Sequence, residues 1–206
     1  LLEEVQDNLE DMQTIAILTS QLLASQDIHQ AGDLLVQQML AHGAYRCAIV
    51  LRSQVEGETW LEVIAAADTD RTAAEQLGVG TRTPLSQVAS TMAAIESAYE
   101  NKQALFFPDV NKSVMLSEQE KQSQLDLGVR AWALLPLVED DEMVGHLSIS
   151  YREPHAFSMR EIGFDTALTG QAAVVMQSIR RLEETRAALA ENRTLYQISW
   201  AVSKAT

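Results

Sequence analysis

Apolar positions that recur every three or four residues predict a helix at each end of the chain. Residues 1–24 contain no glycine or proline, and their stripe consists of Leu2, Val5, Leu9, Met12, Ala16, Thr19 and Leu23. Such a stripe over about three heptads is typical of a helix that pairs with another helix. We therefore predict that residues 1–24 form a linker or coiled-coil helix.

A longer helix is predicted from Ser158 to about residue 203. Ser158 is a typical N-cap, and Glu161 stands three residues later as its capping-box partner. A helix of about 45 residues spans roughly 65 Å, which exceeds the size of any domain that this chain can build. We expect the part up to residue 180 to pack on the domain. Residues 181–206 then form a linker helix that leads to a next domain.

Strand and helix signals alternate between the two end helices. Apolar runs typical of strands cover residues 45–52, 59–67, 104–107, 131–138 and 143–151. Apolar faces and caps predict helices over residues 28–41, 86–101 and 117–124. Turn signals separate the first two strands and the last two strands, so each of these pairs is predicted to form an antiparallel hairpin.

Period-two alternation in the last strand predicts two different faces. One face carries Gly145, Leu147 and Ile149, and the other carries Val144, His146, Ser148 and Ser150. The apolar face suits a cover of helices. The polar face is then expected to line a pocket.

Composition and charge narrow the classes of function. The chain has 206 residues, of which 47% are apolar and 21% are charged, as in a globular protein. With 15 basic and 29 acidic residues the net charge is −14, so we expect neither nucleic-acid binding nor membrane contact. Cys47 is the single cysteine, which excludes an internal disulfide and a cysteine-based metal site.

The chain carries no signal for export or membrane insertion. No apolar run reaches the length of a membrane span, and no signal peptide opens the sequence. We therefore expect a cytoplasmic location. Because the sequence begins at Leu1 rather than at a methionine, we expect it to be part of a longer protein.

Three local patterns resemble those of the GAF domain family. The first is residues 106–110, a strand that ends in Pro-Asp. The second is residues 127–137, a loop that enters a strand closing on Pro-Leu. The third is residues 143–149, a Val-Gly-x-Leu strand that precedes the Phe-Ser start of the last helix. Their order and spacing extend the resemblance over about residues 25–180.

The resemblance implies an α+β fold. In this family a central antiparallel sheet carries helices on one face and a small-molecule pocket on the other. The function implied is regulatory rather than catalytic, and the ligands of the family vary widely, so the fold does not determine the ligand.

Two ligand classes of the family do not suit this sequence. Photoreceptor members attach a bilin to a cysteine, often in the segment before the fourth strand, but residues 111–128 contain none. We interpret Cys47 as a buried apolar side chain. A cyclic-nucleotide branch carries Asn-Lys where this chain has Ser150 and Tyr151. We therefore expect neither a covalent bilin nor a cyclic nucleotide.

Five residues are candidates for ligand binding: Asp109, Arg130, Trp132, His146 and Ser148. His146 is interpreted as a hydrogen-bonding contact of a polar ligand, a haem ligand or a satisfied histidine of the core. Trp132 forms either a wall of the pocket or part of the core. Asp109 either caps the loop after its strand or accepts hydrogen bonds from a ligand. Arg130 pairs either with an anionic ligand or with the acidic surface.

The sequence contains no recognisable catalytic or metal-binding motif. None of the four histidines lies in a His-x-His or His-x-x-x-His pair, and the chain has no phosphate-binding Gly-rich loop and no Gly-x-Ser-x-Gly elbow. We therefore predict a non-catalytic sensory module without a metal. It would pass a small-ligand or partner signal to an output domain such as a histidine kinase, a nucleotide cyclase or a phosphodiesterase. The alternative is a structural dimerisation spacer without a ligand.

The end helices predict a parallel homodimer. The expected interface consists of Leu2, Val5, Leu9, Met12, Leu182 and Leu189. An isolated helix exposes such apolar side chains to water, whereas pairing with a second copy buries them.

Overall fold

The computed structural model describes the backbone of residues 2–89 and 92–204. Within this range it describes the side chains except those of residues 2–5, 7–8, 89, 191–192 and 194–204. The long helices are α1 (Leu2–Leu23), α2 (Ile28–Ala41) and α7 (Met159–Lys204). The strands are β1 (Arg46–Val55), β2 (Glu58–Asp68), β3 (Arg82–Pro84), β4 (Leu105–Phe107), β5 (Ala131–Glu139) and β6 (Glu142–Tyr151). The short helices are α3 (Ala73–Gln76), α4 (Leu85–Ala89), α5 (Ala93–Asn101), η1 (Val110–Lys112) and α6 (Glu118–Asp126).

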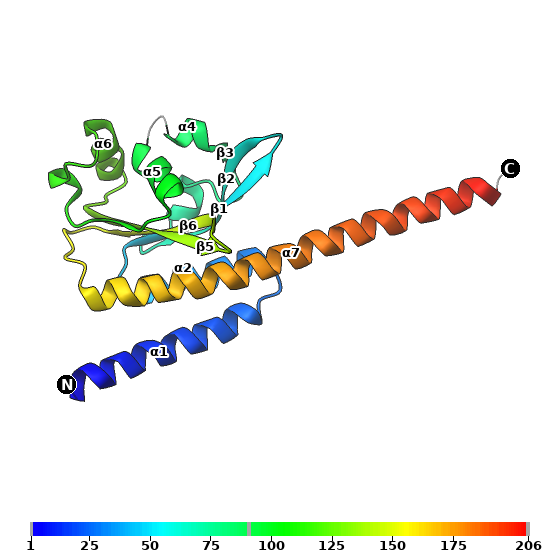
Figure 1. Cartoon of the computed structure of the whole chain (residues 1–206). Coiled ribbons are helices and arrows are strands. Elements are labelled where there is room, and N and C mark those ends of the chain that lie inside the picture. The colour runs from blue at the N-terminus through cyan, green and yellow to red at the C-terminus, as the bar shows by residue number, and fades with distance from the viewer. Residues whose placement is uncertain (1, 90–91, 205–206) are drawn as a thin grey trace.

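The strands form one antiparallel sheet between two layers of helices. Their order in the described residues is β3-β2-β1-β6-β5-β4. In Figure 1, α2 and α7 cover one face of the sheet, α1 lies outside them, and α4, α5 and α6 gather over the other face. This arrangement confirms the predicted α+β fold class with a central antiparallel sheet.

Both predicted hairpins are confirmed, since β1 pairs antiparallel with β2 and β5 with β6. The first turn has left-handed backbone at Glu56 (φ 52°) and Gly57 (φ 85°), as a two-residue hairpin turn requires. The second turn has the same hand at Asp140 (φ 49°) and Asp141 (φ 61°). Aspartate tolerates this region better than most residues, so the acidic turn suits the hairpin.

The single helix predicted over residues 86–101 is wrong. The structure has α4 up to Ala89 and α5 from Ala93, and the backbone of Met92 is not helical (φ −142°). A carboxylate oxygen of Glu120 on α6 accepts a hydrogen bond from the backbone nitrogen of Ala94 at 3.0 Å. Another helix therefore satisfies the first turn of α5. Apolar periodicity along the chain does not reveal such a distant cap.

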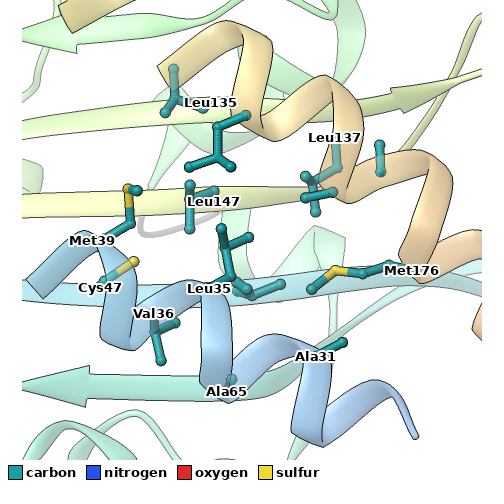
Figure 2. Close-up of a cluster of buried hydrophobic side chains, with 14 of the residues drawn as sticks. Ala31, Leu35, Val36, Met39, Cys47, Ala65, Leu135, Leu137, Leu147 and Met176 are labelled. Carbon is teal, nitrogen blue, oxygen red and sulfur yellow. The ribbon is translucent and has the colours of Figure 1, made fainter. Parts of the chain in front are cut away.

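The two predicted faces of β6 are confirmed except at Val144, which packs against the larger core instead of facing the cavity, next to a register shift in the pairing of β5 and β6. Leu147 and Ile149 are buried against α2 and α7 in the larger core. Figure 2 shows Leu147 in this core together with Leu35 of α2 and Met176 of α7. His146 lies on the opposite face, where it lines a cavity.

The domain buries only parts of the two end helices. Leu18 and Leu22 of α1 are buried in the larger core, so the last turns of α1 pack with the sheet domain. Helix α7 has 46 residues and is about 69 Å long, and Figure 1 shows its C-terminal half extending beyond the sheet. Leu182 and Leu189 on this half are about half exposed. In the described part of the chain, no helix combines the length and apolarity needed to cross a membrane.

Candidate functional site

A cavity of about 290 Å³ lies on the sheet face opposite α2 and α7. Strands β1, β2, β5 and β6 form its floor, and residues of α5 and α6 with the adjoining loops form its cover. Its polar lining includes Arg46, Gln124, His146, Ser148 and Ser150. Its apolar lining includes Val50, Val63, Leu77, Met92, Ile95 and Trp132.

Strand pairing explains why polar residues meet on this floor. Arg46 of β1 stands opposite Ser150 of β6, and Val50 stands opposite His146. Side chains two residues apart in a regular strand share a face. The residues that line the cavity are therefore alternate ones: Arg46, Ala48 and Val50 of β1, and His146, Ser148 and Ser150 of β6. Trp132 of β5 stands opposite Ser150 and adds an aromatic ring to the same face.

His146 is buried, and Tyr99 of α5 contacts its ring. The Tyr99 hydroxyl lies 3.0 Å from Nδ1 of His146, and the two rings meet edge to face with centroids 5.7 Å apart. Burial lowers the pKa of His146 to about 4, so the imidazole is neutral near neutral pH. Burial also raises the pKa of Tyr99, which keeps its hydroxyl protonated. The neutral ring has one nitrogen left for a further hydrogen bond.

Trp132 and Ser148 form a second fixed contact on the floor. The indole Nε1 of Trp132 donates a hydrogen bond to Oγ of Ser148 at 2.8 Å. The indole also stacks on Phe107 of β4, with ring centroids 5.0 Å apart and an interplanar angle of 14°. Trp132 is therefore both a residue of the smaller core and a wall of the cavity.

Arg46 brings a buried cation to the cavity. Its Nη2 donates to Oδ2 of Asp68 at 2.9 Å and to Oε1 of Gln76 at 2.7 Å. Burial opposes ionisation of Asp68, but hydrogen bonds from Thr72 and Arg46 outweigh it and lower the pKa of this carboxyl. Nε and Nη1 of Arg46 are buried and have no hydrogen-bond partner. Buried donors normally have partners, so these two nitrogens are free to donate to a ligand or a water molecule.

The structure separates Asp109 and Arg130 from the other three candidates. Asp109 caps η1 by accepting a hydrogen bond from the backbone nitrogen of Asn111 at 3.1 Å. Arg130 places Nη2 3.4 Å from Oδ1 of Asp109, and Lys112 places Nζ 3.3 Å from Oδ2. Neither Asp109 nor Arg130 lines the cavity, whereas Trp132, His146 and Ser148 do. A role of these five residues in ligand binding stays a prediction.

Sequence reasoning did not identify Arg46, Gln124 or Tyr99. A signal for Arg46 was available, because alternation in the first strand puts it on the face of Ala48 and Val50. No local pattern indicates Gln124 or Tyr99. Their positions over the floor depend on how α5 and α6 fold back onto the sheet.

Cys47 lies on the other face of the sheet. It is fully buried in the larger core, and Figure 2 shows it close to Met39 of α2. Burial raises the pKa of this thiol. This environment matches the interpretation of Cys47 as a buried apolar side chain. Among the residues with described side chains, no group of three or more His, Cys, Asp or Glu residues could hold a metal ion.

Solved structures show the same fold. The GAF domain of a phosphoenolpyruvate-protein phosphotransferase from Coxiella burnetii is 19% identical, with a TM-score of 0.65 over 85% of this chain and 98% of that chain. A domain of a putative two-component sensor histidine kinase from Sinorhizobium meliloti 1021 is 20% identical, with a TM-score of 0.52 over 77% and 94%. The chromophore-binding domain of the bacteriophytochrome RpBphP3 from R. palustris is 16% identical, with a TM-score of 0.63 over 85% and 63%.

These structural similarities show the fold, whereas comparison with family sequence profiles shows the family. No curated protein matches the chain. The sequence profile of the family described as "GAF domain" matches residues 25–177, which is well over half of the 206 residues. On this match, the chain belongs to the GAF domain family.

Proposed function

We propose that this chain is a sensory GAF module that binds a small molecule in the cavity over β1, β2, β5 and β6. The observation that carries the proposal is the buried guanidinium of Arg46, whose Nε and Nη1 have no hydrogen-bond partner and whose side chain lines the cavity. Burying a guanidinium without full hydrogen bonding is costly unless an acceptor arrives. A bound ligand would supply that acceptor.

The lining of the cavity supports a class of ligand. Arg46 offers donors to a carboxylate or carbonyl oxygen, and neutral His146 and Ser150 offer further hydrogen bonds. The remaining wall is mainly apolar. A volume of about 290 Å³ is at the small end of ligand pockets. These features suit a small, partly apolar molecule with a carboxylate or carbonyl group.

The sheet supports a route for the signal to α7. β6 presents His146 and Ser148 to the cavity and Leu147 to the core beneath it. Leu168 and Met176 of α7 are buried in that same core. A ligand that favours one packing of β6 therefore favours one position of α7, provided that it binds the two states with different affinity. The output would be a neighbouring signalling domain such as a histidine kinase, a nucleotide cyclase or a phosphodiesterase.

The end helices support a homodimer in which this signal is transmitted. Leu9 and Met12 of α1 and Leu182 and Leu189 of α7 expose apolar surface. The side chains of Leu2 and Val5, which belong to the same predicted interface, lie outside the described residues. Pairing of two copies in parallel would cover the exposed stripes.

Native mass spectrometry of the freshly purified chain, with an absorption spectrum of the same sample, tests the proposal. We expect one small, non-covalent adduct per protomer and its loss in Val50→Phe, which fills the floor of the cavity. The matched control is Val55→Phe, on an exposed position at the end of the same strand. A Soret band would identify haem, the alternative ligand of His146.

The spacer hypothesis predicts a different result. A ligand-free dimer whose thermal stability does not change with small carboxylic acids would favour a structural spacer over a sensor. The double variant Arg46→Gln with Asp68→Asn removes both buried charges together, so no unpaired ion is left. If this variant folds and keeps the adduct, the role proposed for Arg46 is wrong.

A further inference from the structure

A second cavity lies at the start of α7, on the opposite side of the sheet from the first. Its volume is about 260 Å³, and α1, α2, the end of β6 and the first turns of α7 form its walls. β6 contributes Ile149 and Tyr151 to this cavity but His146, Ser148 and Ser150 to the other. The two cavities therefore occupy different faces of one strand.

Asp165 of α7 lines this second cavity and has an unsatisfied carboxylate. The residue is 5% exposed, and its Oδ2 is buried without a hydrogen-bond partner. Carboxylate oxygens in protein interiors are normally hydrogen-bonded, because the loss of hydration is costly. Burial first, and then the charge of Glu161, raises the pKa of Asp165 to about 7.

The neighbouring Arg160 and His155 side chains contact other carboxylates. Arg160 places Nε 2.8 Å and Nη2 3.0 Å from the carboxylate of Asp11 on α1. His155 places Nε2 2.6 Å from Oε1 of Glu161, which also accepts a hydrogen bond from the Tyr151 hydroxyl at 3.0 Å. Among the residues that line this cavity, Asp11, Glu161 and Asp165 are acidic, whereas Arg160 is the one lysine or arginine.

Aromatic rings also line the second cavity. His42 at the end of α2 stacks on Phe164, with ring centroids 5.3 Å apart and an interplanar angle of 28°. Both residues line the cavity, as does Tyr151. Flat rings beside a carboxylate are suited to a cation with an apolar body. Because no metal-binding group of three residues occurs among the described side chains, we consider an organic cation rather than a metal ion.

We propose that this cavity binds a small organic ammonium ion, whose N–H groups bond to Asp165 and whose apolar body lies against Phe164 and His42. Such a ligand would contact α1, α2 and α7 at once. It would therefore join the first turns of the long helix α7 to the N-terminal helices, independently of any ligand in the first cavity.

An NMR titration of the 206-residue chain with benzylamine tests the proposal, at about pH 8 where Asp165 is ionised. Benzyl alcohol has a similar shape without the charge and is the control ligand. We expect benzylamine to cause saturable shifts at the amides of Phe164 and Asp165, without shifts at Trp132 and His146. We expect benzyl alcohol to bind at least about tenfold more weakly, as a lost charged hydrogen bond implies.

Two variants separate binding at Asp165 from a general charge effect. Asp165→Asn keeps the shape of the side chain and should weaken benzylamine binding at least about tenfold. Asp33→Asn changes an exposed aspartate of α2 outside the cavity and should leave the affinity unchanged. The proposal is overturned by the absence of saturable shifts, by equal binding of amine and alcohol, or by full affinity in Asp165→Asn. The comparison of amine and alcohol uses the unaltered chain, so it holds even if a variant fails to fold.

Discussion

The indole nitrogen of Trp132 on β5 and the hydroxyl oxygen of Ser148 on β6 lie 2.8 Å apart and are joined by a hydrogen bond. The bond provides a partner for the only polar side-chain atom of Trp132, whose ring is otherwise packed against Phe107. It also fixes the hydroxyl of Ser148 on the floor of the cavity. A residue predicted as a ligand contact thus has a structural partner as well.

Ser148→Ala should lower the free energy of unfolding by about 1 to 2 kcal/mol, because the buried indole N–H loses its acceptor. The matched control is Ser178→Ala on α7, whose exposed hydroxyl bonds only to the backbone of its own helix. Urea denaturation of the two variants and the unaltered chain measures the difference. Equal stability of both variants would show that Ser148 does not contribute to the packing of Trp132.

Gly145→Ala should destabilise the sheet strongly, by more than about 2 kcal/mol. A Cβ at this position would lie 2.3 Å from the backbone oxygen of Val50 and 3.1 Å from Cα of Leu51, so the strands would have to move apart. Gly170→Ala is the control, because a Cβ there meets nothing within 4 Å. We expect Gly170→Ala to stabilise α7 by up to about 1 kcal/mol. Thermal unfolding of both variants should therefore shift in opposite directions.

Asp165 should give the protein a pH dependence of a defined sign. The pKa of its carboxyl is about 7 in the folded state, against 3.8 for the unperturbed group. Between these values the folded state holds a proton that the unfolded state has lost. The contribution of Asp165 to the free energy of unfolding therefore falls as the pH rises from about 4 to about 7, by up to about 1.4 kcal/mol per unit.

Asp165→Asn removes this titration. The variant should match the unaltered chain in stability near pH 4 and exceed it increasingly up to about pH 8. Urea denaturation at a series of pH values measures the difference. A difference that does not vary with pH would contradict the raised pKa.

The exposed leucines of α7 should control the oligomeric state. Leu182→Gln combined with Leu189→Gln should shift the chain from dimer to monomer in sedimentation velocity. The stability of the protomer should change little, because both side chains are about half exposed in the single chain. Val114→Gln changes an apolar residue that is 98% exposed but lies outside the end helices, and should leave the dimer intact. A monomeric unaltered chain would contradict the predicted interface.

Local patterns were sufficient to predict most of the fold. Alternation in β6 predicted that Leu147 would face the helices and His146 the cavity, because side chains alternate along a regular strand. It failed at Val144, next to the register shift between β5 and β6. Ser158 and Glu161 predicted the start of α7, and the capping box between their side chains and backbones is present.

The candidate site was predictable only in part. Arg46 owes its position to Asp68 and Gln76, which are 22 and 30 residues away in the sequence. Asp109 and Arg130 looked equally suited to a ligand, but they pair with each other at the start of η1. The first turn of α5 is capped by Glu120, which lies 26 residues from Ala94. Pairings of this kind arise from tertiary packing and have no local signature.

Helix α7 runs without a break from Met159 to Lys204. Its length therefore fixes both the distance and the rotational orientation of anything attached to its C-terminal end. Each residue of an α-helix turns the chain by about 100° around the axis. Inserting one residue beyond Arg181 would therefore rotate anything attached to the far end by about that angle, whereas inserting seven would rotate it by only about 20°. The number of residues in α7 thus sets the rotational angle between this domain and anything attached to the end of the helix.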